Sequence, residues 1–468
     1  MNRAEAERRS RVTALGLTTL IHLLVAAVLA WMILEPFAPG APELEIQPIS
    51  QGEPKLEFNR PTFTQTLLRK PSSRESGAFD LVVTPLPSRV SAVSLENVSE
   101  SFGTGLGNDF GAGGDGLGPG GGGSFYLEPS MKGRCNQEDR ARRLRENGGS
   151  PALDRKVVAA LDWLQKEQNP DGSWGRTYPV AMTGFAVLAF SGHCETVDSP
   201  RYGETLIKAI NYLVDASRTG QGMMVSKPGT HSPYEHGIAT YALAEAYSLN
   251  KNARAKVKRI SNALRNSVPV IVEGQTKGGG WLYSYGQAGT GDLSISGWSI
   301  QALKAAKLSG IRFAGIDRAL EKALEYLKVA ATPDGLYRYR IRDDQPGRLS
   351  LTGVGVLCGR MLGETMANEE LSLAAILAYQ PKQFRSADLY ALYYHSQACF
   401  QKGGKTWAKY NGSQQKLVID SQEKDGSWPV AAGHVGAVQA DAKIYHTCLC
   451  TLMLEVYYRY LPATDTRS

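Results

Sequence analysis

The sequence contains almost no segment that is typical of a β-strand. Its one run of β-branched residues, 268–272, includes Pro269, which cannot donate a ladder hydrogen bond. Apolar residues instead recur with the 3.6-residue period of a helix, as in the segments 238–246 and 295–305. The sequence therefore predicts an all-α fold.

The six cysteines form no CxxC pair and no dense disulfide pattern. Cys448 and Cys450 would project about 200° apart on a helix and should not bridge each other. We expect most of the cysteines to be small buried residues.

No stripe of basic and aromatic residues accompanies the net charge of +7, which is spread along the chain. This distribution argues against a nucleic-acid partner. The basic run at 140–145 is flanked by Glu138, Asp139 and Glu146, so we expect a solvated helix face there.

A turn of the form Gln-x3-Gly-x-Trp occurs at 168–174 and again at 422–428, with degenerate copies at 278–281 and 332–337. Glycine can adopt positive φ after a helix, and the tryptophan can then pack on both flanking helices. The glutamine can bond backbone groups that the helix end leaves unpaired. Each copy therefore predicts a helix, a turn and a second helix, repeated along the chain.

Six such pairs can be placed between residues 154 and 460. The first helices are expected to begin near residues 154, 203, 252, 315, 368 and 406. The second helices, richer in small and apolar residues, are expected at 180–192, 234–249, 294–308, 350–362, 387–401 and 442–460.

The repeated turn resembles the Gln-Trp repeat of squalene and hopene cyclases, and residues 151–462 resemble the prenyltransferase and squalene oxidase repeat family. The resemblance implies an (α/α)6 toroid, in which six helix hairpins form an inner and an outer ring. A generic helical solenoid with chance Gly-Ser-Trp turns is the alternative.

Residues 12–34 carry no formal charge and are long enough to cross a membrane as one transmembrane helix. Arginines in the tail 1–11 and glutamates after residue 34 predict a cytoplasmic tail and a periplasmic toroid, anchored in the cell inner membrane. A cleaved signal peptide would normally have a shorter apolar region and an Ala-x-Ala site. Residues 35–150, rich in proline and glycine, predict a flexible linker.

The predicted anchor contains His22, a titratable group inside the span. The spacing Thr18-x3-His22 is similar to the anchor of TonB-type energy transducers, with threonine in place of serine. That resemblance implies coupling to a proton-driven motor complex. A neutral imidazole bonded to a carbonyl or a neighbouring helix is the alternative.

The acids of the related cyclases are missing. Neither Asp-x-Asp-Asp, which supplies a strong acid in those enzymes, nor Asp-Asp-x-x-Asp is present. The pair Asp343-Asp344 lies in a polar stretch that is typical of a salt-bridged turn. Standard cyclase chemistry is therefore disfavoured.

Protein prenyltransferases offer a second comparison. Asp292 and Trp298 match the spacing around part of their zinc site, and His446 lies in a matching Tyr-His-Thr-Cys segment. The cysteine ligand is replaced by Ser294, whose hydroxyl is a poor zinc ligand. We therefore expect no zinc and no other cofactor. Asp292 could equally be a helix N-cap, and His446 a core residue.

Closure of the toroid would bring Asp292 near His446, where the carboxylate would raise the pKa of the imidazole. The pair could then hold a ligand, act as acid and base, or form only a structural hydrogen bond. The candidate ligand-pocket residues are Trp281, Tyr283, Trp298 and Tyr445.

The sequence thus predicts a membrane-anchored envelope protein whose toroid is a binding or scaffold domain for a hydrophobic ligand or another envelope protein. The alternative is an enzyme similar to terpenoid cyclases or prenyltransferases that lacks the usual acid. A deep cavity joining Asp292 and His446 would favour the enzyme, and an axis filled by side chains would favour the scaffold.

Overall fold

The computed structural model describes residue 22 and residues 134–459, apart from 230, 252, 255–256, 258, 342–344 and 432–435. Residues 134–459 belong to one compact unit. Within the described residues, no helix is both long and apolar enough to cross a membrane. The predicted anchor and most of the predicted linker lie outside this part of the chain, and only His22 of the anchor is described.

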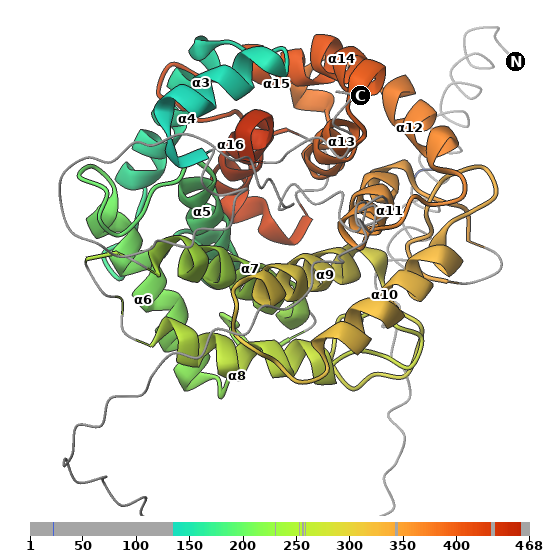
Figure 1. Ribbon diagram of the computed structural model, residues 1–468, viewed down its shortest axis with the longest axis horizontal. Coiled ribbons are helices and arrows are strands. Elements are labelled where there is room, and N and C mark those ends of the chain that lie inside the picture. The colour runs from blue at the N-terminus through green and yellow to red at the C-terminus, as the bar shows by residue number, and fades with distance from the viewer. Residues whose placement is uncertain are drawn as a thin grey trace, which may run out of the picture. The chain divides into compact units, whose positions relative to one another are not determined.

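Twelve stretches of helix form two concentric rings (Figure 1). The outer ring contains α4 (Pro151–Lys166), α6 (Gly203–Thr219), α8 (Ile260–Glu273), α10 (Ile316–Ala330), α12 (Glu369–Ala378) and the segment formed by α14 (Gly404–Tyr410), η2 (Asn411–Gln415) and α15 (Lys416–Asp420). The inner ring contains α5 (Pro179–Gly192), α7 (Ser232–Asn250), α9 (Leu293–Leu308), α11 (Leu349–Met361), α13 (Leu389–Lys402) and α16 (Ala442–Arg459). The predicted all-α fold of six helix hairpins is confirmed for this part of the chain.

The distribution of apolar residues around a helix determines whether it lies in the outer or the inner ring. Outer helices such as α10 bury one apolar stripe and expose a charged face. Inner helices such as α9 are buried on all sides from Leu293 to Ala306, because they pack against two inner neighbours and the outer ring.

The glutamines of the repeated turn join neighbouring outer helices. Gln168 Nε2 donates to Gly172 O at 3.0 Å within its own turn and to Thr205 O of α6 at 2.9 Å. Gln422 Nε2 makes the same pair of bonds, to Gly426 O and to Lys156 O of α4, both at 2.8 Å.

Gln275 begins a third complete copy, where the sequence analysis recognised only the degenerate end at 278–281. Its Nε2 donates to Gly279 O at 2.8 Å and to Ala319 O of α10 at 2.7 Å. The predicted role of the glutamine is confirmed in all three copies.

The tryptophans of the three turns are buried and make one shared bond. Each indole N–H donates to the carbonyl ten residues earlier, at the end of the preceding outer helix. The bonds are Trp174 to Leu164 at 2.7 Å, Trp281 to Ile271 at 2.7 Å and Trp428 to Val418 at 2.8 Å.

The last repeat closes the ring on the first. Gln422 bonds α4, as described, and Asp441 accepts backbone N–H groups from Arg176, Thr177 and Tyr178 just before α5. Asp441 ends η3 (Gly436–Asp441), immediately before α16. A closed ring, and not an open solenoid, follows from these contacts.

Two local expectations need correction, and one covalent bond was not foreseen. The first helix expected to begin near residue 252 is α8, which begins at Ile260 and contains the run 268–272 with Pro269. The linker was expected to reach residue 150, but α3 (Gln137–Glu146) is helical and packs against α4 and α16. A disulfide joins Cys135 to Cys194, although their 59-residue separation carries no recognisable motif.

The remaining cysteines agree with the expectation. Cys358, Cys399, Cys448 and Cys450 are buried and free, and Cys448 is not bridged to Cys450.

Candidate functional site

Aromatic side chains from four inner helices contact one another across the interior of the inner helix ring. Phe185 of α5 lies 5.3 Å between ring centroids from both Trp298 of α9 and Tyr445 of α16. Tyr393 of α13 stacks on Trp298 at 5.7 Å with an interplanar angle of 20°. We call these four residues the aromatic axis.

The aromatic axis is tightly enclosed. Trp298 is 1% exposed and Tyr393 is equally buried. A glycine of α7 allows this packing, because a Cβ at Gly237 would lie only 3.3 Å from Trp298 Cβ. Side chains therefore occupy the place where a toroid could enclose a ligand.

The loops that lead into the inner helices carry a second aromatic group at one end of the ring. Tyr178 lies edge-on to His231 at 5.6 Å, and His231 lies edge-on to Tyr283 at 5.8 Å. The hydroxyls of Tyr283 and Tyr339 are 2.5 Å apart. These four residues precede α5, α7, α9 and α11, and we call them the aromatic rim.

The aromatic rim is partly exposed and carries a cation. The guanidinium of Arg340 lies 5.9 Å from the Tyr283 ring centroid and 5.8 Å from that of Tyr339. All four rim side chains are half-buried, in contrast with the aromatic axis. The rim is thus a surface that can stack on a ligand or partner from solvent.

Asp292 lies next to the rim and is the N-cap of α9. Its Oδ1 accepts bonds from the Ser294 N–H at 3.0 Å and from the Ser294 hydroxyl at 2.5 Å. Its Oδ2 lies 3.5 Å from Arg340 Nε. Burial raises the pKa of Asp292, and the bonds from Ser294 and Tyr339 offset part of that effect. The capping role weighed from the sequence is the one observed.

His446 has different neighbours from Asp292. Its Nδ1 lies 3.2 Å from the Ala431 N–H, and the carboxylate whose charge acts on its ring is Asp388. Among the described residues, no hydrogen bond or ion pair joins Asp292 to His446.

The expected rise in the pKa of His446 is wrong. Burial lowers this pKa to about 4, and the charge of Asp388 offsets only part of the effect. Desolvation disfavours the imidazolium more strongly than the charge of the Asp388 carboxylate favours it.

A second histidine has the same structural role. His236 accepts the Met224 N–H on Nδ1 at 3.0 Å and bonds Ser267 O through Nε2 at 3.0 Å. Like His446, it lies on an inner helix and holds the turn that precedes it. This similarity favours a structural role for His446 over a catalytic one.

Because three histidines are buried, we expect the domain to lose stability in acid. Burial lowers the pKa of His236, His395 and His446 to about 4, from an ordinary value of 6.5. The unfolded chain therefore binds protons first, and the free energy of unfolding should fall as pH drops from 6.5 through 4. The loss should approach roughly 3 kcal/mol per histidine.

Denaturant unfolding between pH 7 and pH 4 measures this effect. The variant His446→Gln should show a shallower fall than the parent, and His231→Gln, on the partly exposed rim, is the control. Equal pH dependence of His446→Gln and the parent would contradict the assignment.

The four ligand-pocket candidates lie in three different places. Trp281 is a buried turn residue of the repeat, with its indole N–H bonded to Ile271 O. Trp298 and Tyr445 belong to the aromatic axis, and only Tyr283 reaches the partly exposed rim. Tyr178 and His231 were not predicted from the sequence, and the one signal that they share is their position just before an inner helix.

Within the residues that the structure describes, no group of three or more His, Cys, Asp or Glu side chains could hold a metal ion. The hydroxyl of Ser294, which replaces the cysteine of the zinc-site pattern, instead donates to Asp292.

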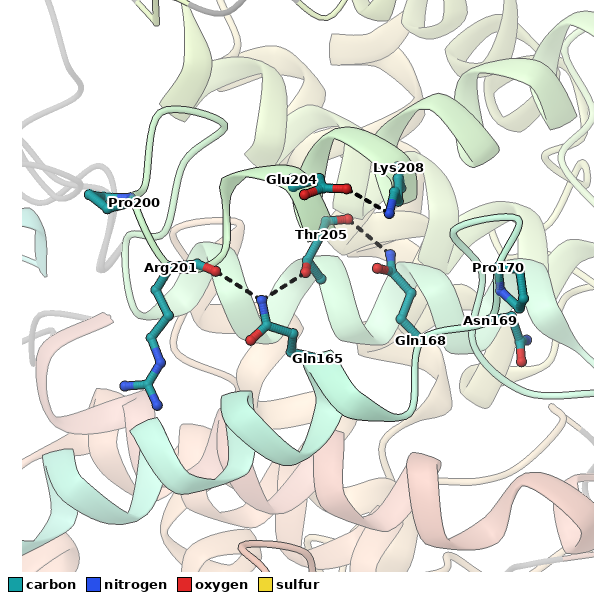
Figure 2. Close-up of a pocket in the computed structure, with 9 residues that line it drawn as sticks. All are labelled: Gln165, Gln168, Asn169, Pro170, Pro200, Arg201, Glu204, Thr205 and Lys208. Atoms are coloured by element: carbon teal, nitrogen blue, oxygen red, sulfur yellow. Dashed lines mark hydrogen bonds and ion pairs between the residues drawn. The ribbon is translucent and has the colours of Figure 1, made fainter.

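A recess of about 380 Å³ lies on the outer ring between α4 and α6 (Figure 2). Gln165 and Gln168 project into it, but their amides donate to Arg201 O and Thr205 O. Lys208 and Glu204 form an ion pair at 2.8 Å. These polar groups already have hydrogen-bond or ion-pair partners within the fold. The recess is therefore the contact between two neighbouring outer helices and a weak candidate for a ligand-binding site.

No protein-family model matches the sequence, and neither does any curated protein. Among solved structures, an inactive variant of the α-1,6-mannanase GH76A of Salegentibacter sp. HEL1_6, in complex with α-1,6-mannotriose, is similar at a TM-score of 0.48 and 9% identity, covering 65% of this chain and 99% of that chain. A variant of the type II terpene cyclase MstE from Scytonema, in complex with geranylgeranyl dihydroxybenzoate, is similar at a TM-score of 0.46 and 12% identity, covering 69% and 99%. These similarities concern the arrangement of helices, and nothing about the chemistry of this chain follows from them.

Proposed function

We propose that this chain is a single-pass protein of the cell inner membrane, whose periplasmic toroid is a binding or scaffold domain of the envelope. The observation that carries the proposal is the aromatic axis. A toroid that encloses a substrate needs an open axis, and here Phe185, Trp298, Tyr393 and Tyr445 occupy it.

Asp292, the buried acid next to the aromatic rim, supports a non-catalytic function for the toroid. A cyclase needs a carboxylic acid that is free to protonate an alkene. Asp292 is instead committed to capping α9 and to the ion pair with Arg340. The enzyme alternative, similar to terpenoid cyclases or prenyltransferases, would require the aromatic axis to open and another acid to act.

The aromatic rim is the surface proposed for binding. Its tyrosine rings and the Arg340 guanidinium suit a hydrophobic ligand or an envelope protein that presents apolar and acidic groups. Variants Tyr283→Ala and Tyr339→Ala should weaken such binding. Tyr247→Ala is the matched control, because Tyr247 is also half-buried but lies near the C-terminal end of α7, away from the rim residues that precede the inner helices.

The disulfide supports the proposed compartment. Stable disulfides form in oxidising surroundings such as the bacterial periplasm and are rare in the cytosol. The bond between Cys135 and Cys194 is therefore consistent with a toroid outside the cytoplasmic membrane.

Reporter fusions test the topology. Alkaline phosphatase fused after Ser468 should be active in cells, and a reporter that works only in the cytoplasm should be inactive at the same position. Fusion at the C-terminus avoids Ser150, which is the N-cap residue of α4. The opposite pattern would refute the proposed orientation.

Incubation of the full-length protein with long-chain isoprenoids tests the absence of cyclase chemistry. We expect no cyclised product by mass spectrometry. A product that disappears in Asp292→Asn would establish the enzyme alternative.

A further inference from the structure

Each of the four loops that carry the aromatic rim also carries an exposed basic residue. These residues are Arg176, Lys227, Lys277 and Arg348, in the loops before α5, α7, α9 and α11. Among the described residues, no acid forms an ion pair with any of these four side chains. The loops 220–231 and 274–291 contain no acidic residue at all. The four bases therefore give the surroundings of the rim an excess of positive charge.

The aromatic rim provides ring surfaces between these bases. Tyr178, His231 and Tyr283 follow one another in edge-on contact, with ring centroids 5.6 Å and 5.8 Å apart. The Arg348 guanidinium lies 4.9 Å from the ring centroid of Tyr339, so base and ring share one surface. Aromatic side chains line the surfaces that recognise proline-rich segments in the polyproline II (PPII) conformation. The rim and its bases therefore suit a chain that combines proline with acidic residues.

The chain itself contains such a segment outside the described residues. Its prolines, all separated by multiples of three positions, are Pro36, Pro39, Pro42, Pro48 and Pro54. Because PPII has three residues per turn, this spacing favours that conformation with the prolines on one face. The acids of the same segment are Glu43, Glu45, Glu53 and Glu57, and its one base is Lys55. We call residues 36–57 the proline segment.

The rest of the predicted linker lacks this combination. Residues 58–133 contain seven acids and six bases, so their charges nearly cancel. Their longest stretch without a base, 90–131, includes the glycine-dense run 103–123. Ordering glycine costs more conformational entropy than ordering a proline-rich chain that already favours PPII. The proline segment is therefore the part of the chain that best complements the rim.

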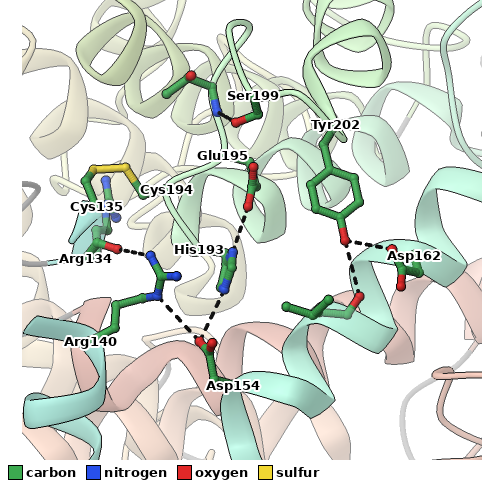
Figure 3. A network of polar contacts seen from close by, with 12 residues as sticks. Arg134, Cys135, Arg140, Asp154, Asp162, His193, Cys194, Glu195, Ser199 and Tyr202 are labelled. Carbon is green, nitrogen blue, oxygen red and sulfur yellow. Dashed lines mark hydrogen bonds and ion pairs between the residues drawn. A yellow bond between two sulfur atoms is a disulfide. The ribbon is translucent and has the colours of Figure 1, made fainter. Parts of the chain in front are cut away.

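The length of the linker allows the proline segment to reach the rim. The chain enters the domain at Arg134, whose Nη2 donates to Glu245 Oε2 near the end of α7 at 2.8 Å, whereas the rim precedes the first turn of that helix. The disulfide from Cys135 to Cys194, after α5, fixes this entry point (Figure 3). A chain as long as residues 58–133 has an end-to-end distance of roughly 50 Å, against about 28 Å for the length of α7. A linker of this kind gives an effective concentration on the order of millimolar, which favours this segment over a separate protein.

We propose that the aromatic rim binds the proline segment of its own chain in the PPII conformation, and that an envelope partner has to displace this segment. This occupant presupposes the proposed function of the rim as a binding surface. In the docked state the prolines lie against the rings and the glutamates face the four bases. The carbonyls of PPII make no internal hydrogen bonds, so they accept bonds from the rim tyrosines. Because the proline segment directly follows the predicted anchor, docking holds the rim close to the membrane.

A labelled peptide of residues 36–57 tests this occupancy on the detergent-solubilised full-length protein. By fluorescence anisotropy, Glu43→Gln/Glu45→Gln/Glu53→Gln/Glu57→Gln should bind the peptide about ten-fold more tightly than the parent, because its own segment no longer competes. The matched control replaces four glutamates outside the segment, at positions 75, 96, 100 and 128, and should bind as weakly as the parent.

Rim variants locate the peptide. Adding Arg348→Gln/Lys277→Gln, two exposed positions, to the glutamine variant should abolish the gain. Equal affinity of the parent and the glutamine variant would overturn the contact within the chain but leave the rim a binding surface. A gain that survives Arg348→Gln/Lys277→Gln would place the segment elsewhere and overturn the proposal. Absence of binding by both proteins would also overturn it, and the proposed function would keep its own test in Tyr283→Ala and Tyr339→Ala.

Photo-crosslinking distinguishes a contact within one chain from a contact between two copies. With p-benzoylphenylalanine in place of Ile46, full-length protein should form a cross-link to the loops 220–231, 274–291 or 331–348. The yield should not change on ten-fold dilution, and the same group in place of Val82 should give no such link. Cross-links to other parts of the toroid, or a yield that falls on dilution, would refute binding of the proline segment to the rim of its own chain.

Discussion

Replacing Gly426 with alanine is expected to lower the free energy of unfolding by more than about 3 kcal/mol. Gly426 has φ +95°, which costs an L-residue roughly 1–2 kcal/mol. Its new Cβ would also overlap the backbone of α4, lying 2.6 Å from Ala159 C. Because Ala159 is a backbone neighbour in the first outer helix, relief requires the last and first repeats to separate.

Denaturant unfolding of the Gly426→Ala variant measures this cost. Gly412 provides the control, since no described heavy atom lies within 4 Å of a Cβ built there and the residue is helical. Gly412→Ala should be neutral or stabilising by up to about 1 kcal/mol. If Gly426→Ala unfolds like Gly412→Ala, the ring does not close through this turn.

The second large effect is expected at the turn tryptophans. Trp174→Ala, Trp281→Ala and Trp428→Ala should each cost about 3–5 kcal/mol, because each removes a fully buried ring. Each change also leaves a buried carbonyl of the preceding helix without its indole donor.

Phenylalanine at the same positions separates the two contributions. The Trp→Phe variants keep most of the buried area and lose only the hydrogen bond, so they should be less destabilised than the alanine variants in thermal unfolding. If the alanine variants melt at the temperature of the parent, these tryptophans do not hold the repeat together.

The fold could be predicted because the residues that determine each turn and each helix lie close together in the sequence. The spacing from Gln168 to Trp174 places a turn, and the apolar period on each side places two helices. Five of the six first helices begin within a few residues of the expected position. The copy at Gln275 was overlooked because glycines at 278–280 conceal its spacing, and α8 was misplaced because no capping residue marks Ile260.

The candidate site could be predicted only where one element determines it. Asp292 was readable as an N-cap, since the bond to Ser294 is made within the same turn. The aromatic axis joins four helices from distant parts of the chain, and no local pattern sets their distances. The pKa of His446 depends on how completely the surrounding helices bury its imidazole. No local sequence pattern determines that burial.

Binding of small apolar molecules tests most directly whether side chains fill the axis of the toroid. Ligand-observed NMR with benzene and with a long-chain isoprenoid alcohol can compare the parent with Trp298→Ala. We predict no saturable binding by the parent and binding of benzene by Trp298→Ala, because an engineered apolar cavity accepts such a ligand. Saturable binding of the isoprenoid by the parent, lost when Phe185 is replaced with tryptophan, would contradict it.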